Sequence, residues 1–91
     1  MSRPLKDKLD VFEALAHPVR RELIAAMKGG ALPATALVAK FKMSQPALSH
    51  HLQVLRRAGV VKQQQAGRQR LYLANAVALR QAHRWLSKQL D

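Results

Sequence analysis

Apolar residues recur every three to four positions over most of the chain, which is the spacing of one face of an α-helix. A first stripe predicts a helix over about residues 6–16 and consists of Leu5, Leu9, Phe12 and Ala16. His17 and Pro18 interrupt it, because proline fits poorly inside a helix but well in the first turn of the next one. A second helix therefore begins at Pro18, and Gly29–Gly30 ends it.

Two shorter helices are predicted in the middle of the chain. Pro33 opens one over about residues 34–41, and Ser44 is a natural N-cap for the next, which Gly59 stops. A tight connection at residues 42–43 separates them. The inward positions of these two helices are Leu37, Val38, Phe41, Leu48, Leu52 and Leu55.

After Gly59 the spacing changes from helical to alternating, which predicts a hairpin. We expect one strand over residues 60–65, a turn at Ala66–Gly67, and a return strand in which Leu71 and Leu73 alternate with polar neighbours. Asn75 can cap a last helix over about residues 76–90. The apolar face of that helix comprises Leu79, Ala82, His83, Leu86 and Leu90.

Two helices joined by a tight turn and followed by a basic hairpin are typical of a winged helix-turn-helix. The predicted fold class is therefore mainly α with a small β-hairpin, in one domain covering residues 1–91, because the sequence contains no repeat and no linker. A domain this short buries only about 60 to 65% of its unfolded surface, which favours a homo-oligomer.

The charge is unevenly distributed. Sixteen Lys and Arg against five Asp and Glu give a net charge of +11, and no carboxylate occurs between residues 23 and 90. This balance indicates a polyanionic partner, and double-stranded DNA is the first candidate. It argues against carboxylate-based hydrolysis or magnesium chemistry, so we expect no enzyme.

The absence of cysteine excludes disulfides, thiolate metal sites and thiol switches. No apolar run approaches the roughly 18 residues of a membrane span, and the N-terminus is charged rather than signal-like. We therefore expect a cytoplasmic protein that does not enter membranes.

The outer face of the helix after Ser44 carries the predicted DNA contacts. Gln45, Ser49 and His50 lie near its N-terminus, where recognition helices reach base edges. Cations on and beside that helix are better placed for phosphates, and two arginines fall on the hairpin. The full predicted set is Lys40, Lys42, Ser44, Gln45, Pro46, Ser49, His50, Gln53, Arg56, Arg57, Arg68 and Arg70. Arg20 and Arg21 are left out, because Glu13 and Glu22 lie close enough in sequence for one of them to be structural.

Three segments together carry a family resemblance: ALAHPVRR at residues 14–21, SQPALSHHLQVLRRAGV at 44–60 and AGRQRLY at 66–72. They resemble the arsenic-repressor (ArsR/SmtB) family of bacterial transcription repressors over nearly the whole chain. The resemblance implies a homodimeric winged-helix repressor on a palindromic operator, joined through its first and last helices. Candidate interface residues are Leu9, Phe12, Leu79, His83, Trp85, Leu86 and Leu90.

The chain departs from the metal-sensing and thiol-sensing members of that family. The segment at 34–41 has no cysteine, and the last helix offers only His83 as a ligand. Adjacent side chains on a helix point about 100° apart, so His50 and His51 cannot chelate together; we expect His50 toward DNA and His51 toward the domain. We expect no metal and no cofactor. By resemblance to relatives of this kind, we expect a repressor of its own operon that is relieved by a protein partner or by dilution.

Other functions remain open on the sequence alone. A nucleoid-like or RNA-binding protein would explain the charge without sequence preference, and a protein-interaction winged helix would bind DNA weakly. A metal-responsive repressor would use His83 and its symmetry mate. A serine-based enzyme is the weakest alternative, because Ser49 beside His50 is a helix pattern rather than a triad.

Overall fold

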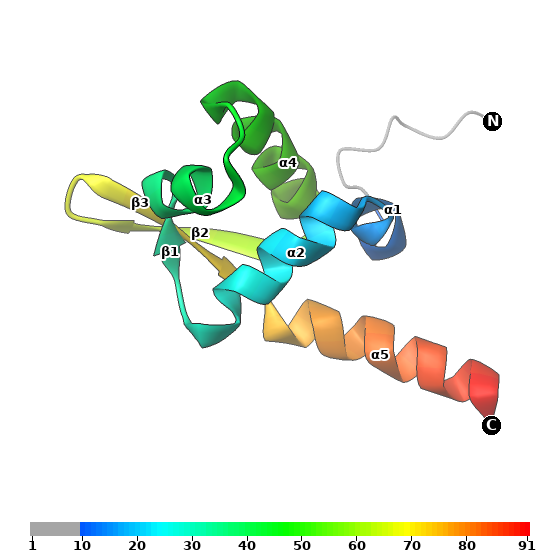
Figure 1. Cartoon of the computed structure of the whole chain (residues 1–91). Helices are drawn as coiled ribbons and strands as arrows, with labels where there is room; N and C mark the ends of the chain where they lie inside the picture. Colours follow the sequence, from blue (N-terminus) through cyan, green and yellow to red (C-terminus); the bar gives the residue numbers. More distant parts are fainter. Residues whose placement is uncertain (1–9) are drawn as a thin grey trace, which may run out of the picture.

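In the computed structural model, which describes residues 10–91, helices gather at one end of a small antiparallel sheet whose hairpin projects to the side (Figure 1). Over these residues the helices are α1 (Val11–Leu15), α2 (Pro18–Ala26), η1 (Met27–Gly29, a 3₁₀ turn), α3 (Ala34–Phe41), α4 (Gln45–Arg57) and α5 (Ala76–Leu90). The strands are β1 (Leu32–Pro33), β2 (Val61–Ala66) and β3 (Gln69–Ala74), in the order β1-β3-β2. The predicted winged helix-turn-helix architecture is confirmed.

The predicted helix over residues 6–16 is not continuous through Asp10. This residue has an extended backbone with ψ of 145° and is the N-cap of α1, which begins at Val11; the predicted start near residue 6 lies outside the described residues. The backbone N–H of Asp10 donates to Glu13 Oε1 at 3.0 Å, which is half of a capping box. Residues 1–9 lie outside the described residues, and with them Leu9 of the predicted interface.

The sheet differs from the predicted hairpin in two details. A third strand, β1, pairs with β3 through Leu32↔Tyr72 and Pro33↔Leu71. The hairpin turn is Gly67–Arg68 rather than Ala66–Gly67, because Ala66 pairs with Gln69. Gly67 takes a φ of +63°, which glycine adopts without a steric penalty. The shift places Arg68 at the tip of the hairpin, which we call the wing.

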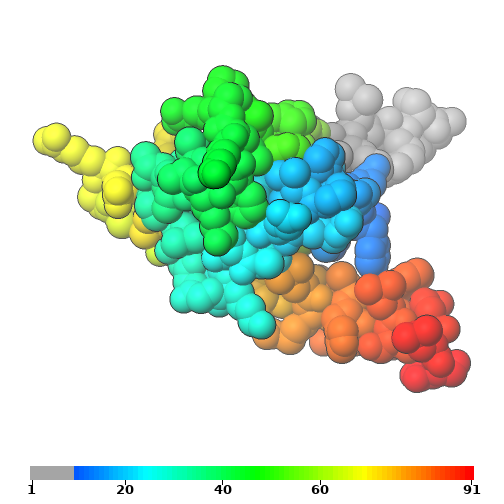
Figure 2. All heavy atoms as spheres, viewed as in Figure 1, coloured from blue at the N-terminus to red at the C-terminus, as the bar shows by residue number. Residues whose placement is uncertain are grey.

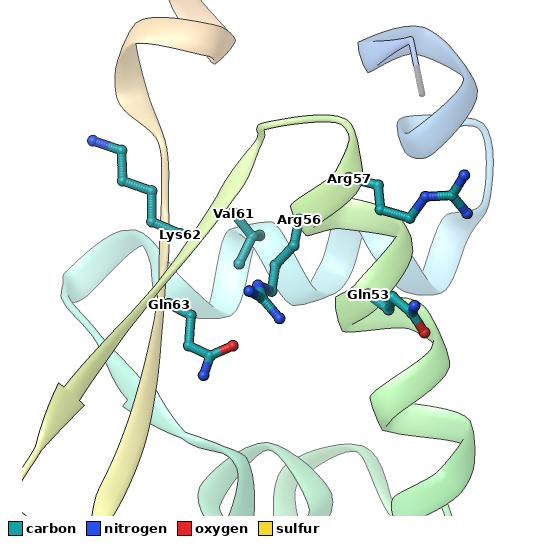
Figure 3. Close-up of a pocket in the computed structure, with 6 residues that line it drawn as sticks. All are labelled: Gln53, Arg56, Arg57, Val61, Lys62 and Gln63. Carbon is teal, nitrogen blue, oxygen red and sulfur yellow. The ribbon is translucent and has the colours of Figure 1, made fainter. Parts of the chain in front are cut away.

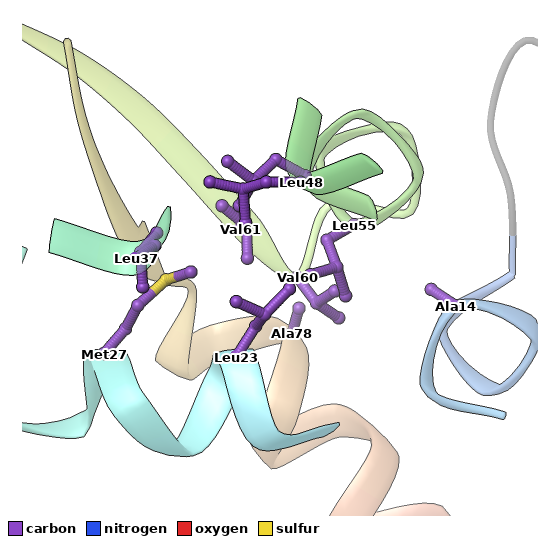
Figure 4. Packing of buried hydrophobic residues seen from close by; sticks show 10 residues of the cluster. Ala14, Leu23, Met27, Leu37, Leu48, Leu55, Val60, Val61 and Ala78 are labelled. Atoms are coloured by element: carbon purple, nitrogen blue, oxygen red, sulfur yellow. The ribbon is translucent and has the colours of Figure 1, made fainter. Parts of the chain in front are cut away.

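The core lies where α2, α3, α4 and the start of the wing meet (Figure 4). The inward stripe predicted for α4 is confirmed, since Leu48, Leu52 and Leu55 are all buried. The other members of the buried cluster are Ala14, Leu23, Met27, Leu37, Val60, Val61 and Ala78. Each buried leucine removes enough apolar surface from water to contribute roughly 1.5 to 3 kcal/mol. The orientation of α4 is therefore fixed by hydrophobic packing.

Local hydrogen bonds hold the ends of α4 and α5. Ser44 Oγ accepts from the backbone N–H of Ala47 at 3.2 Å, which confirms the predicted N-cap. Asn75 Oδ1 accepts from the N–H of Val77 at 3.2 Å, while Asn75 Nδ2 donates to the carbonyl oxygen of Gly59 at 2.8 Å. One side chain thus caps α5 and ties it to the turn that follows α4.

Two arginines connect α1 to α2. Arg20 Nε donates to the carbonyl oxygen of Ala14, and Arg21 Nη1 donates to that of Leu15, both at 2.6 Å. These carbonyls belong to the last turn of α1, where cations are favourable. Both arginines are therefore structural, where the sequence had indicated one.

A half-buried histidine of α4, His51, lies against this junction. His51 Nδ1 is 3.5 Å from a guanidinium nitrogen of Arg20, and its ring centroid is 4.9 Å from that of His17. His17 is the N-cap of α2, with Nδ1 accepting from the N–H of Val19. Burial lowers the pKa of His51, and the charges of His17, Arg20 and His50 lower it further. His51 packs inside the domain as predicted, in its neutral form at pH 7.

We expect Asn75→Ala to lower the free energy of unfolding by about 1 to 2 kcal/mol, because it removes a helix cap and a bond to Gly59. Asn75→Asp keeps the cap but sets a carboxylate oxygen against the Gly59 carbonyl oxygen, so it should also lower the free energy of unfolding. Urea unfolding measures both, with the exposed Gln81→Ala as a control that changes little. Equal stability of Asn75→Ala and wild type would contradict this role.

The lowered pKa of His51 predicts that acid destabilises the domain. The folded state binds a proton at His51 less readily than the unfolded chain, so this stabilisation is complete above the ordinary pKa of about 6.5 and is lost as the pH falls below it. Urea unfolding at pH 7.5 and pH 5 should show a larger loss for wild type than for His51→Gln. Parallel pH profiles for the two proteins would exclude the effect.

Candidate nucleic-acid interface

The helix α4 buries only one stripe of residues, so most of its circumference is exposed. One exposed edge faces the wing and carries Gln45, Ser49 and Arg56. Among the other exposed positions of α4, His50 and Arg57 lie on the side opposite the buried stripe. Polar side chains on both edges can donate hydrogen bonds to a ligand that lies against the helix.

A hollow of about 370 Å³ separates the N-terminal half of α4 from the wing. It is lined by the start of α3, by Gln45 and Ser49 of α4, and by the side chains of β3. Its full lining is Pro33, Ala34, Thr35, Gln45, Ser49, Leu52, Arg68, Gln69, Arg70 and Tyr72. The structure thus brings the first turns of α4 and the wing arginines to one concave surface.

A second hollow, of about 550 Å³, lies between the C-terminal half of α4 and β2 (Figure 3). Its lining contains three cations and no carboxylate: Gln53, Arg56, Arg57, Val61, Lys62 and Gln63. A smaller hollow of about 230 Å³ shares Arg70 with the first and Arg56 with the second. The three hollows form one trough along α4, which we call the α4–wing trough.

The α4–wing trough is positively charged, as is typical of a surface that binds a polyanion. Five cations line it, namely Arg56, Arg57, Lys62, Arg68 and Arg70, and none of its lining residues is acidic. Phosphate groups are the ligands that such a donor set binds, because their oxygens accept several charged hydrogen bonds. The wing projects beyond the helices, so its basic tip extends the surface sideways (Figure 2).

Seven of the residues selected from the sequence meet in this trough: Gln45, Ser49, Gln53, Arg56, Arg57, Arg68 and Arg70. The other five do not line it. His50 and Pro46 are exposed on α4 outside the trough, and Ser44 uses its hydroxyl oxygen as the N-cap. Lys40 and Lys42 are exposed at the end of α3, where Lys42 adopts a left-handed φ of 52°. Lys40 and Lys42 thus lie close to the turn between α3 and α4.

Sequence reasoning missed Lys62, Gln63 and Tyr72 as lining residues. Gln63 is half-buried, and its Oε1 is buried without a hydrogen-bond partner in the described part of the chain. The position of Gln63 could have been predicted from strand alternation. Val61 and Gln63 point to the same side of β2, and Val61 is buried. Polar residues at such positions face a neighbouring element rather than solvent alone.

A separate apolar surface lies on α1 and α5. Phe12 is 39% exposed and Trp85 is 54% exposed, and their ring centroids are 5.5 Å apart. Leu86 and Leu90 are also exposed on α5, whereas Leu79 is half-buried against the core and His83 is exposed. We call Phe12, Trp85, Leu86 and Leu90 the α1–α5 apolar face. Apolar area of this kind is typical of protein–protein contact.

Within residues 10–91 no three histidine or acidic side chains are grouped so that they could hold a metal ion. In the same range, every helix is too short or too polar to cross a membrane.

The chain matches the family model of a helix-turn-helix domain over residues 15–64. It is 32% identical over 77 residues to the transcriptional repressor SdpR of Bacillus subtilis, covering 85% of this chain and 86% of SdpR. The ArsR family transcriptional regulator RHA00566 superposes with a TM-score of 0.80 at 26% identity, over 88% of each chain.

A further solved structure shows the same fold at lower identity. The homodimeric winged helix-turn-helix DNA-binding domain Mb0332 of Mycobacterium bovis has a TM-score of 0.73 at 22% identity, over 87% of this chain and 75% of that chain. The helix-turn-helix match, the similarity to SdpR and the superposition on RHA00566 agree with one another. The chain therefore belongs to the ArsR/SmtB family of helix-turn-helix transcriptional regulators.

Proposed function

We propose that this protein is a transcriptional repressor that binds a palindromic operator as a homodimer and controls its own operon. The observation that carries the proposal is the α4–wing trough, in which five cations and several amide and hydroxyl groups line one acid-free surface. In this arrangement α4 enters the major groove and the wing lies along the flanking backbone or minor groove. Such a protein acts in the cytoplasm, where bacterial operator DNA is found.

The two halves of the trough have different tasks in this proposal. Gln45 and Ser49, with the neighbouring His50, contact base edges, since glutamine pairs bidentately with adenine and the other two accept several partners. Arg56 and Arg57 at the far end of α4 bind phosphates, as do Lys40 and Lys42 beside its start. Arg68 and Arg70 hold the backbone next to the wing. Ser44 and Pro46 set the first turn of α4, whose N-terminus attracts phosphate.

Dimer formation would use the α1–α5 apolar face. Trp85, Leu86 and Leu90 are large apolar side chains that the described part of the chain leaves exposed. The Mb0332 domain, which has a similar fold, is homodimeric, and this supports a homodimer here. A two-fold axis through this face predicts half-sites separated by about 34 Å, roughly one turn of B-DNA.

Release from DNA would depend on a protein partner rather than on a bound metal or a thiol. The chain has no cysteine, and the described residues offer no group of metal ligands. A partner that binds the dimer away from the trough, or that competes for it, could lower the population of DNA-bound repressor.

We expect Gln45→Ala and His50→Ala to relax the choice of sequence, because removal of a base-reading side chain costs about 1 to 3 kcal/mol only on the matching base pair. Arg68→Ala should instead weaken binding to operator and scrambled duplex alike, since a phosphate contact is independent of sequence. Fluorescence anisotropy on both duplexes separates the two patterns. Equal losses on both duplexes for every variant would refute the division of tasks.

Binding should also weaken steeply with salt. If each dimer neutralises six to ten phosphates, operator affinity falls by ~10³ to 10⁵ between 50 and 200 mM salt. Arg56→Gln should make the slope of log affinity against log salt shallower by about one unit for each phosphate that the variant leaves unneutralised. A slope near zero would contradict a phosphate-binding trough.

A further inference from the structure

One exposed face of α5 is used neither by the α4–wing trough nor by the α1–α5 apolar face. Val77, Arg80, Arg84 and Lys88 follow one another at spacings of three, four and four residues, so they share one side of the helix. All four are exposed, and Val77 is 54% exposed. The stripe is about 16 Å long at the rise of an α-helix. We call these residues the α5 outer stripe.

The core lies on the opposite side of the helix. Ala78 is buried, and Leu79 and Ala82 are half-buried, which fixes the rotation of α5 about its axis. Steps of 100° per residue then place the outer stripe nearly opposite these positions. Trp85, Leu86 and Leu90 lie on the same side of the helix as these core positions, further towards its C-terminal end, so a dimer through the apolar face would leave the stripe accessible.

The stripe is also remote from the DNA-binding surface. In Figure 1 α2 lies between α4 and α5, and α5 extends away from the wing. None of the stripe residues lines the trough. The operator contacts proposed above therefore leave these three cations without a role.

The positive charges of the α5 outer stripe repel one another and lower the stability of α5. Arg80 and Arg84, like Arg84 and Lys88, are like charges four residues apart, and such pairs destabilise a helix. No carboxylate occurs in α5. Among the described residues, no hydrogen bond or ion pair joins these three side chains to another residue. A partner with complementary charge would remove the repulsion.

Val77 indicates the kind of partner. It lies within the stripe, three residues before Arg80 and seven before Arg84, and its exposed apolar surface is covered by neither the core nor the predicted dimer face. A DNA backbone offers phosphates but nothing apolar to cover it, and a lipid surface requires a much wider apolar face. An amphipathic acidic helix offers both carboxylates and an apolar side chain at the matching spacing.

We propose that the α5 outer stripe is a docking surface for an acidic amphipathic segment of another protein, which pairs its carboxylates with Arg80, Arg84 and Lys88 and covers Val77. This surface goes beyond the operator function, because a partner seated here leaves the α4–wing trough open. Repressor and partner can therefore form a complex that still carries its DNA-binding surface.

The test uses the full chain and a labelled synthetic helix of 18 residues, with glutamate at every fourth position and leucine placed opposite Val77. Fluorescence anisotropy measures its affinity, with a scrambled peptide of the same composition as the comparison. The stripe variant is Arg80→Gln/Arg84→Gln/Lys88→Gln, because glutamine keeps helix propensity while removing charge. The matched control is Arg56→Gln/Arg68→Gln/Arg70→Gln, which removes the same charge from the trough.

We expect the stripe variant to lose at least tenfold in peptide affinity while its affinity for a 30-base-pair duplex changes less than threefold. The trough variant should show the reverse. Val77→Ser should weaken the peptide severalfold without affecting the duplex, and thermal melting verifies that each variant is folded. Peptide affinity therefore tests the docking surface and duplex affinity tests the operator function, so either proposal can fail without the other.

Three outcomes would overturn the proposal. Equal loss of peptide binding in both triple variants would mean that net charge alone attracts the peptide, as would equal binding of the scrambled peptide. No peptide binding by wild type would exclude the surface. Stripe-dependent binding of a second duplex, or of vesicles containing phosphatidylglycerol, with no effect of Val77→Ser on the peptide, would assign the stripe to nucleic acid or lipid instead.

Discussion

Burial of one leucine stripe on α4 is the constraint on which the rest of the structure depends. Leu48, Leu52 and Leu55 insert into the core, and this fixes which side of the helix remains exposed. Ser44 fixes where the helix begins, and Asn75 ties the turn after it to α5. Because these contacts set both the rotation and the position of α4, its backbone holds Gln45, Ser49 and Arg56 on the edge that faces the wing.

The same packing connects α4 to the α1–α5 apolar face. Arg20 binds the last carbonyls of α1 and lies against His51 of α4, so α1 and α4 share a half-buried polar junction. Phe12 of α1 contacts Trp85 of α5 on the other side. In the proposed dimer, the route from the α1–α5 apolar face to α4 would run through Phe12, Arg20 and His51. His51, whose pKa is lowered by burial, lies at the α4 end of this path.

Elements governed by local spacing could be predicted from the sequence. The bounds of α3 and α5, the caps Ser44 and Asn75 and the buried stripe of α4 all depend on residues a few positions apart. The start of α1 was also readable, because Asp10 and Glu13 have capping-box spacing, and helical periodicity alone misplaced it. By contrast, β1 depends on pairing between Pro33 and Leu71, and the lining role of Gln63 depends on how β2 packs beside α4. Those relationships join residues far apart in the chain and leave little local trace.

One acid-free surface, built on α4 and the wing, is expected to select a DNA sequence. Binding selection on genomic fragments followed by footprinting measures this selection, with divalent metals and a chelator as separate arms. We expect one short palindrome, protected over two half-sites one helical turn apart and unaffected by metal or chelator. Binding spread over all fragments without sequence preference would contradict a sequence-reading α4, and metal-dependent release would instead place a sensor on His83.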